Sequence, residues 1–265
     1  MSESQAGAAR PVGVFDSGVG GLSILKALRA QLPAESFVYL ADAGFAPYGE
    51  RGDAFVIERT RAVVRKLREE HSIKALVIAC NTATAAAGHL VRAEHPDLPL
   101  VGVEPALKPA VALSKTRRIG MMATRGTVGS AKLRALHDSL KDRAEFILQP
   151  CDGLADAIQN EDVARVQVLC EQYTRVIGPF GSRAGEVDTL VLGCTHYPFV
   201  WDLLQSLVGP DVRLIETGEP VARQTRRLLE AAGQLRPGDV PGSATLLTTG
   251  SQEALQAAAQ RWLGL

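Results

Sequence analysis

The chain has 265 residues, 46% of them hydrophobic, and its 29 Lys and Arg residues balance its 29 Asp and Glu residues. At about 150 residues per domain, this length fits two compact units. The apolar content excludes a disordered chain and a disulfide-stapled miniprotein. Because the net charge is zero, no overall field would draw the chain to nucleic acid or to an anionic membrane, so a small-molecule partner is favoured.

Targeting and membrane signals are missing from the sequence pattern. The longest apolar runs, such as residues 75–80, are far shorter than the ~18 residues that a membrane helix needs. Residues 1–10 contain no apolar core of a signal peptide. The sequence therefore predicts a cytoplasmic protein.

Short β-branched runs alternate with longer amphipathic stretches along the chain. The predicted strands are 12–15, 37–40, 75–79, 100–103, 119–123, 145–148, 188–193, 212–215 and 244–248. The stretches 23–32, 54–70, 83–94 and 107–113, between the first of these runs, have the periodicity of helices. This alternation is typical of βαβ units and predicts parallel sheets covered by helices.

The first four predicted strands resemble the next four in order and composition, about 110 residues further along the chain. The apolar runs 75–80 and 189–194 both end at a cysteine. We therefore predict two pseudo-symmetric parallel-sheet α/β lobes with the active site in the cleft between them. The first lobe is expected to comprise residues 1–98 and 210–265, and the second residues 99–209.

Ligands of open parallel sheets bind at the carboxyl ends of the strands, so functional residues are expected in the turns there. The glycine-rich turn 16–21 begins with Asp16 and Ser17 and leads into a predicted helix. Its N–H groups and the helix dipole favour a bound carboxylate or phosphate. Alternatively, Asp16 or Ser17 only caps that helix. A second loop, with Tyr48 and Gly49, resembles an ordinary turn when taken alone.

The cysteines are few and widely spaced. They are Cys80, Cys151, Cys170 and Cys194. Without a Cys-x-x-Cys pair, no metal site is predicted. Cys80 and Cys194 each follow an apolar strand at the start of a predicted helix, where a thiolate is stabilised. Cys151 and Cys170 lack this setting and are expected to pack in the core.

Each of the two strand-end cysteines stands beside a polar pair. The pairs are Asn81 with Thr82, and Thr195 with His196. If the lobes are related by a pseudo-twofold axis, Cys80 and Cys194 face each other across the cleft. Such an arrangement suits inversion of a carbon stereocentre, in which a base removes a proton from one face and an acid delivers one to the other. Asp16 and His196 would adjust the protonation states of the two cysteines; alternatively, His196 is a hydrogen-bonded core or capping histidine.

Together these motifs resemble those of the glutamate racemases of bacterial cell-wall synthesis. The resemblance is carried by residues 16–21, 47–49, 80–83, 102–106 and 193–198. It implies an isomerase, a two-base amino-acid racemase that interconverts L- and D-glutamate for peptidoglycan synthesis. It also implies that the enzyme uses no cofactor, neither pyridoxal phosphate nor a metal.

The resemblance also implies roles for individual residues. Cys80 would take the α-proton of D-glutamate, and Cys194 that of L-glutamate. The implied substrate-binding residues are Asp16, Ser17, Tyr48, Gly49, Asn81, Thr82, Thr195 and His196. The implied partners are glutamate and a second copy of the chain in a homodimer, with no nucleic acid and no membrane.

The sequence departs from the family pattern at two places. It has residues 41–45, Ala-Asp-Ala-Gly-Phe, ahead of the Pro-Tyr-Gly loop, where many members read Ala-Asp-Thr. It has the amides Gln159 and Asn160 where several members have an acidic residue, which leaves His196 as the expected helper of Cys194.

Three other functions stay open at this stage. One is a racemase for aspartate or another amino acid on the same fold. Another is a hydrolase or amidotransferase that uses one cysteine with His196, although neither strand-end cysteine lies in a Gly-x-Cys-x-Gly elbow. The last is a non-catalytic module that binds an amino acid.

Overall fold

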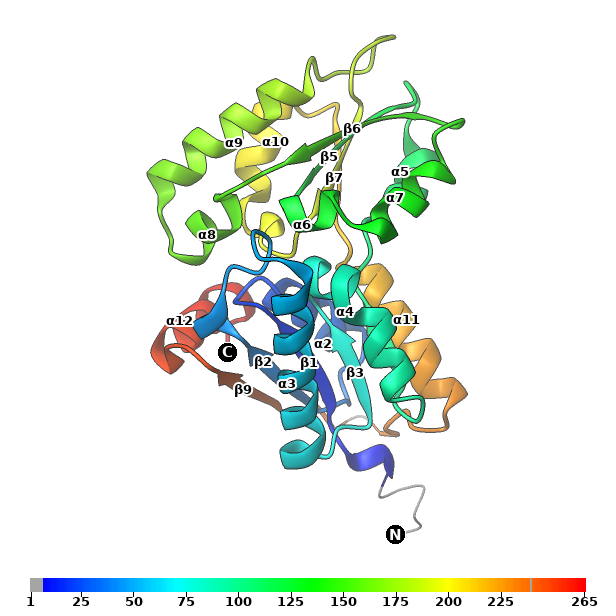
Figure 1. Ribbon diagram of the computed structural model, residues 1–265, viewed down its shortest axis with the longest axis vertical. Helices are drawn as coiled ribbons and strands as arrows, with labels where there is room; N and C mark the ends of the chain where they lie inside the picture. The colour runs from blue at the N-terminus through cyan, green and yellow to red at the C-terminus, as the bar shows by residue number, and fades with distance from the viewer. Residues whose placement is uncertain (1–6, 239) are drawn as a thin grey trace.

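Nine parallel strands form two sheets within residues 7–238 and 240–265, the part of the chain that this computed structural model describes. The five-stranded sheet has the order β4-β3-β1-β2-β9, and the four-stranded sheet the order β6-β5-β7-β8. Each sheet with its helices is one lobe, and Figure 1 shows the second lobe stacked on the first. The strands are β1 (Val12–Asp16), β2 (Phe37–Ala41), β3 (Ala75–Ile78), β4 (Leu100–Gly102), β5 (Arg118–Ala123), β6 (Glu145–Pro150), β7 (Thr189–Gly193), β8 (Arg213–Ile215) and β9 (Ala244–Thr248).

Helices cover both faces of each sheet, as parallel sheets require. They are α2 (Leu22–Gln31), α3 (Asp53–His71), α4 (Asn81–Glu94), α5 (Leu107–Leu113), α6 (Arg125–Val128), α7 (Ala131–Asp138), α8 (Leu154–Gln159), α9 (Val163–Ile177), α10 (Trp201–Val208), α11 (Gly218–Ala231) and α12 (Gln252–Leu263). Two short 3-10 helices, η1 (Ala43–Phe45) and η2 (Tyr197–Val200), follow β2 and β7.

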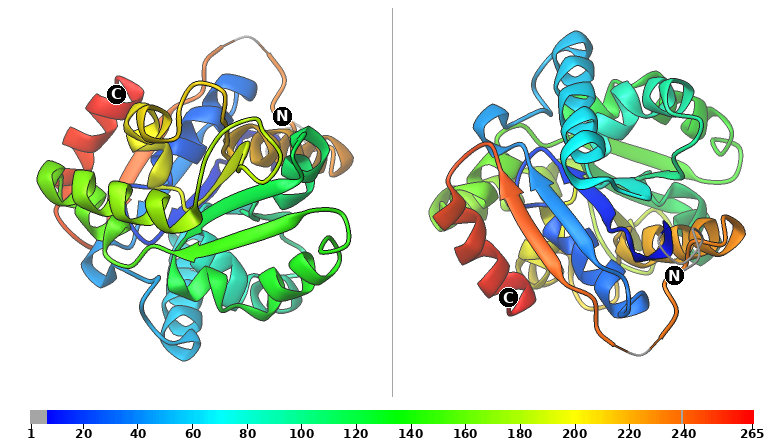
Figure 2. Two further views of the ribbon diagram at one scale, coloured as in Figure 1. Left: turned by 90° about the horizontal axis from the view of Figure 1, so that it is seen from above. Right: turned by 90° about the horizontal axis from the view of Figure 1, so that it is seen from below.

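The strands divide their side chains between two cores in each lobe. In β1, Val12 and Val14 pack with α2, α11 and α12, whereas Phe15 packs on the other face with α3 and α4. Figure 2 shows α3 and α12 on opposite faces of this sheet. In the second lobe, α8, α9 and α10 cover one face, and α5 and α7 the other. Alternation of side chains along a strand produces this division.

The two sheets have the same topology. In the first, β1 lies between β3 and β2, with β4 beyond β3; in the second, β5 lies between β7 and β6, with β8 beyond β7. Only β9, at the edge of the first sheet, has no equivalent among the described strands. The predicted fold class, two pseudo-symmetric parallel α/β lobes, is confirmed.

Strand pairing corrects the expected boundaries between the lobes by one strand at each junction. The edge strand β4 pairs with β3 of the first sheet, although residues 99–209 were expected in the second lobe. Similarly, β8 pairs with β7 of the second sheet, although residues 210–265 were expected in the first. Both are three-residue edge strands. Their composition does not encode which sheet they join, because an edge strand pairs on one side only.

A buried ion pair lies at the amino ends of β2 and β3 in the first lobe. The Lys74 Nζ atom lies 2.6 Å from Glu35 Oε2, and both side chains are 1% exposed. Lys74 also donates to the carbonyl oxygens of Ala8 (2.7 Å) and Gln234 (2.8 Å). Lys74 thus connects the residue before β3 to the segment after α11 and to the segment before β1.

We predict that Lys74→Met destabilises the chain by about 3–5 kcal/mol, because it leaves the Glu35 carboxylate buried without its partner. Lys66→Met is the matched control, since Lys66 pairs with Glu70 on the exposed surface of α3, and it should cost less than about 1 kcal/mol. Urea unfolding of both variants measures the difference. Equal losses would contradict the importance of the buried pair.

Candidate active site

A pocket lies between the lobes at the carboxyl ends of β1, β3 and β7. All ten residues that the sequence predicts for the site line this pocket. They are Asp16, Ser17, Tyr48, Gly49, Cys80, Asn81, Thr82, Cys194, Thr195 and His196.

Cys80 follows β3 and caps the N-terminus of α4. Its backbone is extended (φ −114°, ψ 121°), and its Sγ accepts a hydrogen bond from the N–H of Ala83 at 3.5 Å. The thiol also lies 3.6 Å from the hydroxyl of Ser17, in the neighbouring turn. Burial, reinforced by the negative charge of Asp16, raises the pKa of Cys80 to about 12. The predicted lowering of the pKa by the helix N-terminus is therefore outweighed by desolvation.

Cys194 has a different setting, which corrects the expectation of two equivalent turns. It precedes the short 3-10 helix η2, and not the start of an α-helix. Its Sγ lies 3.8 Å from Nδ1 of His196. Burial raises the pKa of Cys194 well above its ordinary value. The two cysteines thus share burial and protonation but have different neighbours.

The turn 16–21 directs its N–H groups at the carboxylate of its own first residue. The N–H of Ser17 donates to Asp16 Oδ1 at 2.7 Å, and the N–H of Gly21 donates to Oδ2. Thr195 of the second lobe donates its hydroxyl to Oδ2 at 3.2 Å. Burial raises the pKa of Asp16 to about 6. We predicted that the N–H groups of this turn bind the carboxylate or phosphate of a ligand. For Ser17 and Gly21 this prediction is wrong, because their N–H groups already bind the Asp16 carboxylate.

Two glycines in the same turn make room for side chains of the second lobe. A Cβ atom on Gly18 would lie 2.3 Å from Oε1 of Gln159, and a Cβ atom on Gly20 would lie 2.4 Å from Nδ1 of His196. A larger residue at either position would force these side chains of the second lobe to move. The glycines are thus explained by close approach between lobes.

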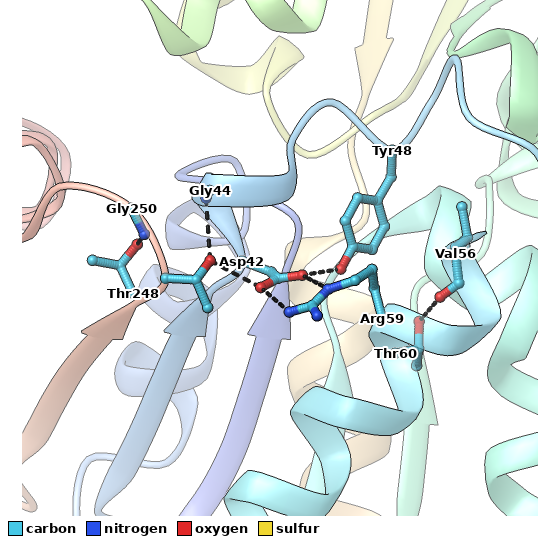
Figure 3. Close-up of polar contacts among 9 residues, drawn as sticks. Asp42, Gly44, Tyr48, Val56, Arg59, Thr60, Thr248 and Gly250 are labelled. Carbon is cyan, nitrogen blue, oxygen red and sulfur yellow. Dashed lines mark hydrogen bonds and ion pairs between the residues drawn. The ribbon is translucent and has the colours of Figure 1, made fainter.

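The side chain of Asp42 stabilises the loop after β2. Figure 3 shows the Tyr48 ring pointing toward Asp42, to which its hydroxyl donates a hydrogen bond. The buried Asp42 carboxylate also pairs with the Arg59 guanidinium (2.9 Å) and accepts from the Thr249 hydroxyl (2.9 Å). The Tyr48 hydroxyl therefore has a structural hydrogen-bond partner in Asp42. Together these contacts hold the loop so that Gly49 lines the pocket.

Three hydrogen bonds join the lobes at residues in and next to the pocket lining. Gly49 accepts a hydrogen bond at its carbonyl from the N–H of Gly126 (2.8 Å). The hydroxyls of Thr82 and Thr124 share a hydrogen bond of 2.9 Å. The carboxylate of Glu50 accepts from the N–H of Gly153 at 2.9 Å. Thr124 was missed in the sequence because a threonine after a strand carries no distinctive signal.

Asn81 is the pocket residue whose side chain is most clearly available to bind a ligand. It lies in the first turn of α4, is 4% exposed and lines the pocket. Neither Nδ2 nor Oδ1 of its side chain has a hydrogen-bond partner among the described residues. Leaving a buried amide unpaired costs free energy, so this side chain is suited to a polar ligand.

The remaining cysteines divide differently from expectation. Cys170 is fully buried in α9, which fits the predicted packing role. Cys151 also packs in the core of the second lobe, yet it lines the pocket with Cys80 and Cys194. Cys151 follows the predicted strand closely in the sequence, but no pair of polar residues comes after it, as one does after Cys80 and Cys194.

The described residues contain no group of three or more His, Cys, Asp or Glu side chains that could hold a metal ion. Within the same residues, no helix combines the length and the apolarity required to span a bilayer.

The two α/β lobes each contribute buried thiols to one pocket between them, and the sequence matches the racemases, which are isomerases. The family model for Asp/Glu/Hydantoin racemase matches residues 13–225. The chain belongs to this family.

Relatives of known name cover nearly the whole chain. The glutamate racemase of Pseudomonas paraeruginosa is 47% identical over 86% of this chain and 84% of its own length. The crystal structure of glutamate racemase isoform RacE1 from Bacillus anthracis has a TM-score of 0.84 and 33% identity, over 97% of this chain and 94% of that one. That of the Francisella tularensis enzyme in complex with D-glutamate has a TM-score of 0.82 and 25% identity, over 97% and 95%.

The burial of His196 makes a prediction for stability against pH. Burial lowers its pKa from 6.5 to about 4, so the folded chain favours the neutral ring. This stability is fully present above pH 6.5 and is lost as the pH falls toward 4, by about 3 kcal/mol. Urea unfolding between pH 7 and 4 should show a loss about 3 kcal/mol larger for the natural chain than for His196→Gln.

Asp16 titrates in the same window with the opposite sign, because its raised pKa makes stability fall as the pH rises through that window. It is present in both proteins, so the difference between them isolates His196. His89→Gln, a variant at an exposed position of α4, should follow the natural chain. Identical pH dependence in His196→Gln and the natural chain would contradict a neutral, buried His196.

Proposed function

We propose that this chain interconverts L- and D-glutamate by a two-base mechanism without a cofactor, with Cys80 and Cys194 as base and acid. The observation that carries the proposal is that buried thiols of both lobes line the same pocket, with Cys80 from the first lobe and Cys194 from the second at equivalent strand ends. It is supported by family membership and by curated relatives that are glutamate racemases. The bound D-glutamate of the Francisella tularensis structure is in keeping with this substrate.

The reaction needs two groups on opposite faces of the α-carbon. For L-glutamate, the Cys194 thiolate takes the α-proton, and the Cys80 thiol gives its own proton to the other face, which leaves D-glutamate. For D-glutamate the two cysteines exchange roles. One residue type can therefore serve both directions, provided that each thiol can lose its proton in turn.

Burial opposes that loss, so the thiolate must be stabilised when substrate binds. The substrate ammonium brings a positive charge into the pocket, and an opposite charge nearby lowers the pKa of a thiol. Asp16 lies beside Cys80, and His196 lies beside Cys194. With pKa values of about 6 and about 4, Asp16 is mainly a carboxylate and His196 is neutral at pH 7. Each can accept a proton from its cysteine.

The substrate carboxylates require donors inside the pocket. The N-terminus of α4 supplies Asn81 and Thr82, of which Asn81 has an unpaired side chain. Ser17, Gly49 and Thr195 complete the proposed binding set from neighbouring turns. Binding of the anion is thus local, which is compatible with a net charge of zero.

We place the activity in peptidoglycan synthesis, as the supply of D-glutamate, and expect a homodimer. Both statements depend on the resemblance to the cell-wall glutamate racemases and on no contact within this chain.

The proposal predicts that Cys80→Ser and Cys194→Ser each lower kcat/KM for glutamate by at least ~10²-fold, because a serine hydroxyl is a far weaker acid and base. Circular dichroism of L-glutamate, with L-aspartate measured in parallel, follows the racemisation. Cys170→Ala is the matched control, since Cys170 lies outside the pocket in α9, and it should keep most of the activity. Full activity in either serine variant would contradict the two-base mechanism, and faster turnover of aspartate would contradict the substrate.

A further inference from the structure

Gln159 ends α8 of the second lobe and reaches into the pocket between the lobes. Its Oε1 atom has two neighbours. The backbone nitrogen of Val19, in the first lobe, lies 2.9 Å away, and Nε2 of His196 also lies 2.9 Å away. One oxygen atom therefore joins the turn 16–21 to the histidine beside Cys194.

The contact with Val19 fixes the orientation of the Gln159 amide. A backbone N–H can only donate a hydrogen bond, so the atom that faces it must be the acceptor. Of the two ends of the amide, only the oxygen accepts. The placement of Oε1 at this point therefore follows from chemistry.

The oxygen then fixes the tautomer of His196. An amide oxygen cannot donate, so Nε2 of His196 must carry the proton in this hydrogen bond. Burial lowers the pKa of His196 to about 4, and the ring is neutral at pH 7. A neutral ring has only one N–H, so Nδ1, 3.8 Å from Cys194 Sγ, is unprotonated.

We propose that Gln159 is a positioning residue that holds His196 as the Nε2–H tautomer, so that Nδ1 accepts the proton of the Cys194 thiol. This inference rests on the proposed function. In the step from L-glutamate, the S–H bond of Cys194 breaks and an N–H bond forms at Nδ1, which leaves a thiolate and an imidazolium. The imidazolium keeps its Nε2–H bond to the Gln159 oxygen. The thiolate takes the substrate proton and becomes a thiol again, while the Cys80 thiol gives its proton to the other face. After D-glutamate leaves, His196 releases its proton to water and the Cys80 thiolate takes one up from water.

The role also depends on closure of the lobes. Val19 belongs to the first lobe, whereas Gln159 and His196 belong to the second, so the acceptor oxygen is held in place only when the lobes meet. Gly18 and Gly20 permit this approach, because a Cβ atom on either would meet Gln159 or His196. The base beside Cys194 is therefore assembled together with the pocket.

The tautomer is tested without reference to activity. In protein with ¹⁵N-labelled histidine, NMR shifts distinguish a protonated from an unprotonated ring nitrogen, and His196→Gln identifies the signals of His196 among those of the five histidines. We expect a protonated Nε2 and an unprotonated Nδ1 in the natural chain. Gln159→Met should lose this preference, whereas Gln159→Glu, which keeps an acceptor oxygen, should keep the proton on Nε2.

Asn160→Ala is the matched control. Asn160 is the adjacent amide, but its exposed side chain bonds to Asp156 and to no other described residue. Its removal should leave the His196 signals unchanged. An unchanged tautomer in Gln159→Met would overturn the proposal.

Kinetic isotope effects test the consequence for catalysis. Gln159→Met should lower kcat/KM about tenfold or more. The decrease should be the same for L- and D-glutamate, because the ratio of their kcat/KM values equals the equilibrium constant of the reaction. With the Cys194 step slowed, the α-deuterium isotope effect should rise for L-glutamate, whose proton Cys194 removes. It should fall for D-glutamate, whose proton Cys80 removes before the slow step. Gln159→Glu should restore most of the natural ratio.

The outcomes separate the inference from the proposed function. Equal changes in the two isotope effects would mean that Gln159 serves only to hold the lobes together, which overturns the positioning role. Absence of racemisation by the natural chain would contradict the proposed function, and the NMR measurement would still decide the tautomer.

Discussion

The structure depends on the close approach of the turn 16–21 to the second lobe. At this contact the carboxylate of Asp16 accepts a hydrogen bond from the hydroxyl of Thr195, and the N–H of Val19 donates one to the side-chain oxygen of Gln159. Gly18 and Gly20 make the approach possible, because they lack the Cβ atoms that would collide with the opposite lobe. A pocket with a thiol from each lobe exists only because these backbones come so near to each other.

Burial is the electrostatic consequence of this approach. The closed pocket raises the pKa values of Cys80, Cys194 and Asp16 and lowers that of His196, in each case chiefly through desolvation. Both thiols and the imidazole are therefore neutral at pH 7, whereas Asp16 is mainly a carboxylate. In the proposed mechanism the charge of the substrate then helps to form a thiolate. The two thiols differ in their helpers, because a carboxylate stands beside Cys80 and an imidazole beside Cys194.

Much of this architecture could be predicted from the sequence, because strands and their terminal turns leave local signals. The apolar run before Cys80 and the matching run before Cys194 predicted a strand in each sheet and placed each cysteine at the carboxyl end of its strand. Contacts between distant segments left no such signal. The sheets that β4 and β8 join depend on their pairing with β3 and β7, and the pKa of Cys80 depends on burial and on the charge of Asp16. The reason for Gly20 lies in the side chains that the second lobe places beside it.

The central claim is that two bases act on opposite faces of one carbon. The most direct measurement follows L-glutamate in deuterated solvent during the first turnovers, with mass spectrometry of each separated enantiomer. The account predicts solvent deuterium at the α-carbon of the D-glutamate product, while the remaining L-glutamate keeps its hydrogen. Deuterium entering both enantiomers at equal early rates, or D-glutamate that retains the original hydrogen, would contradict it.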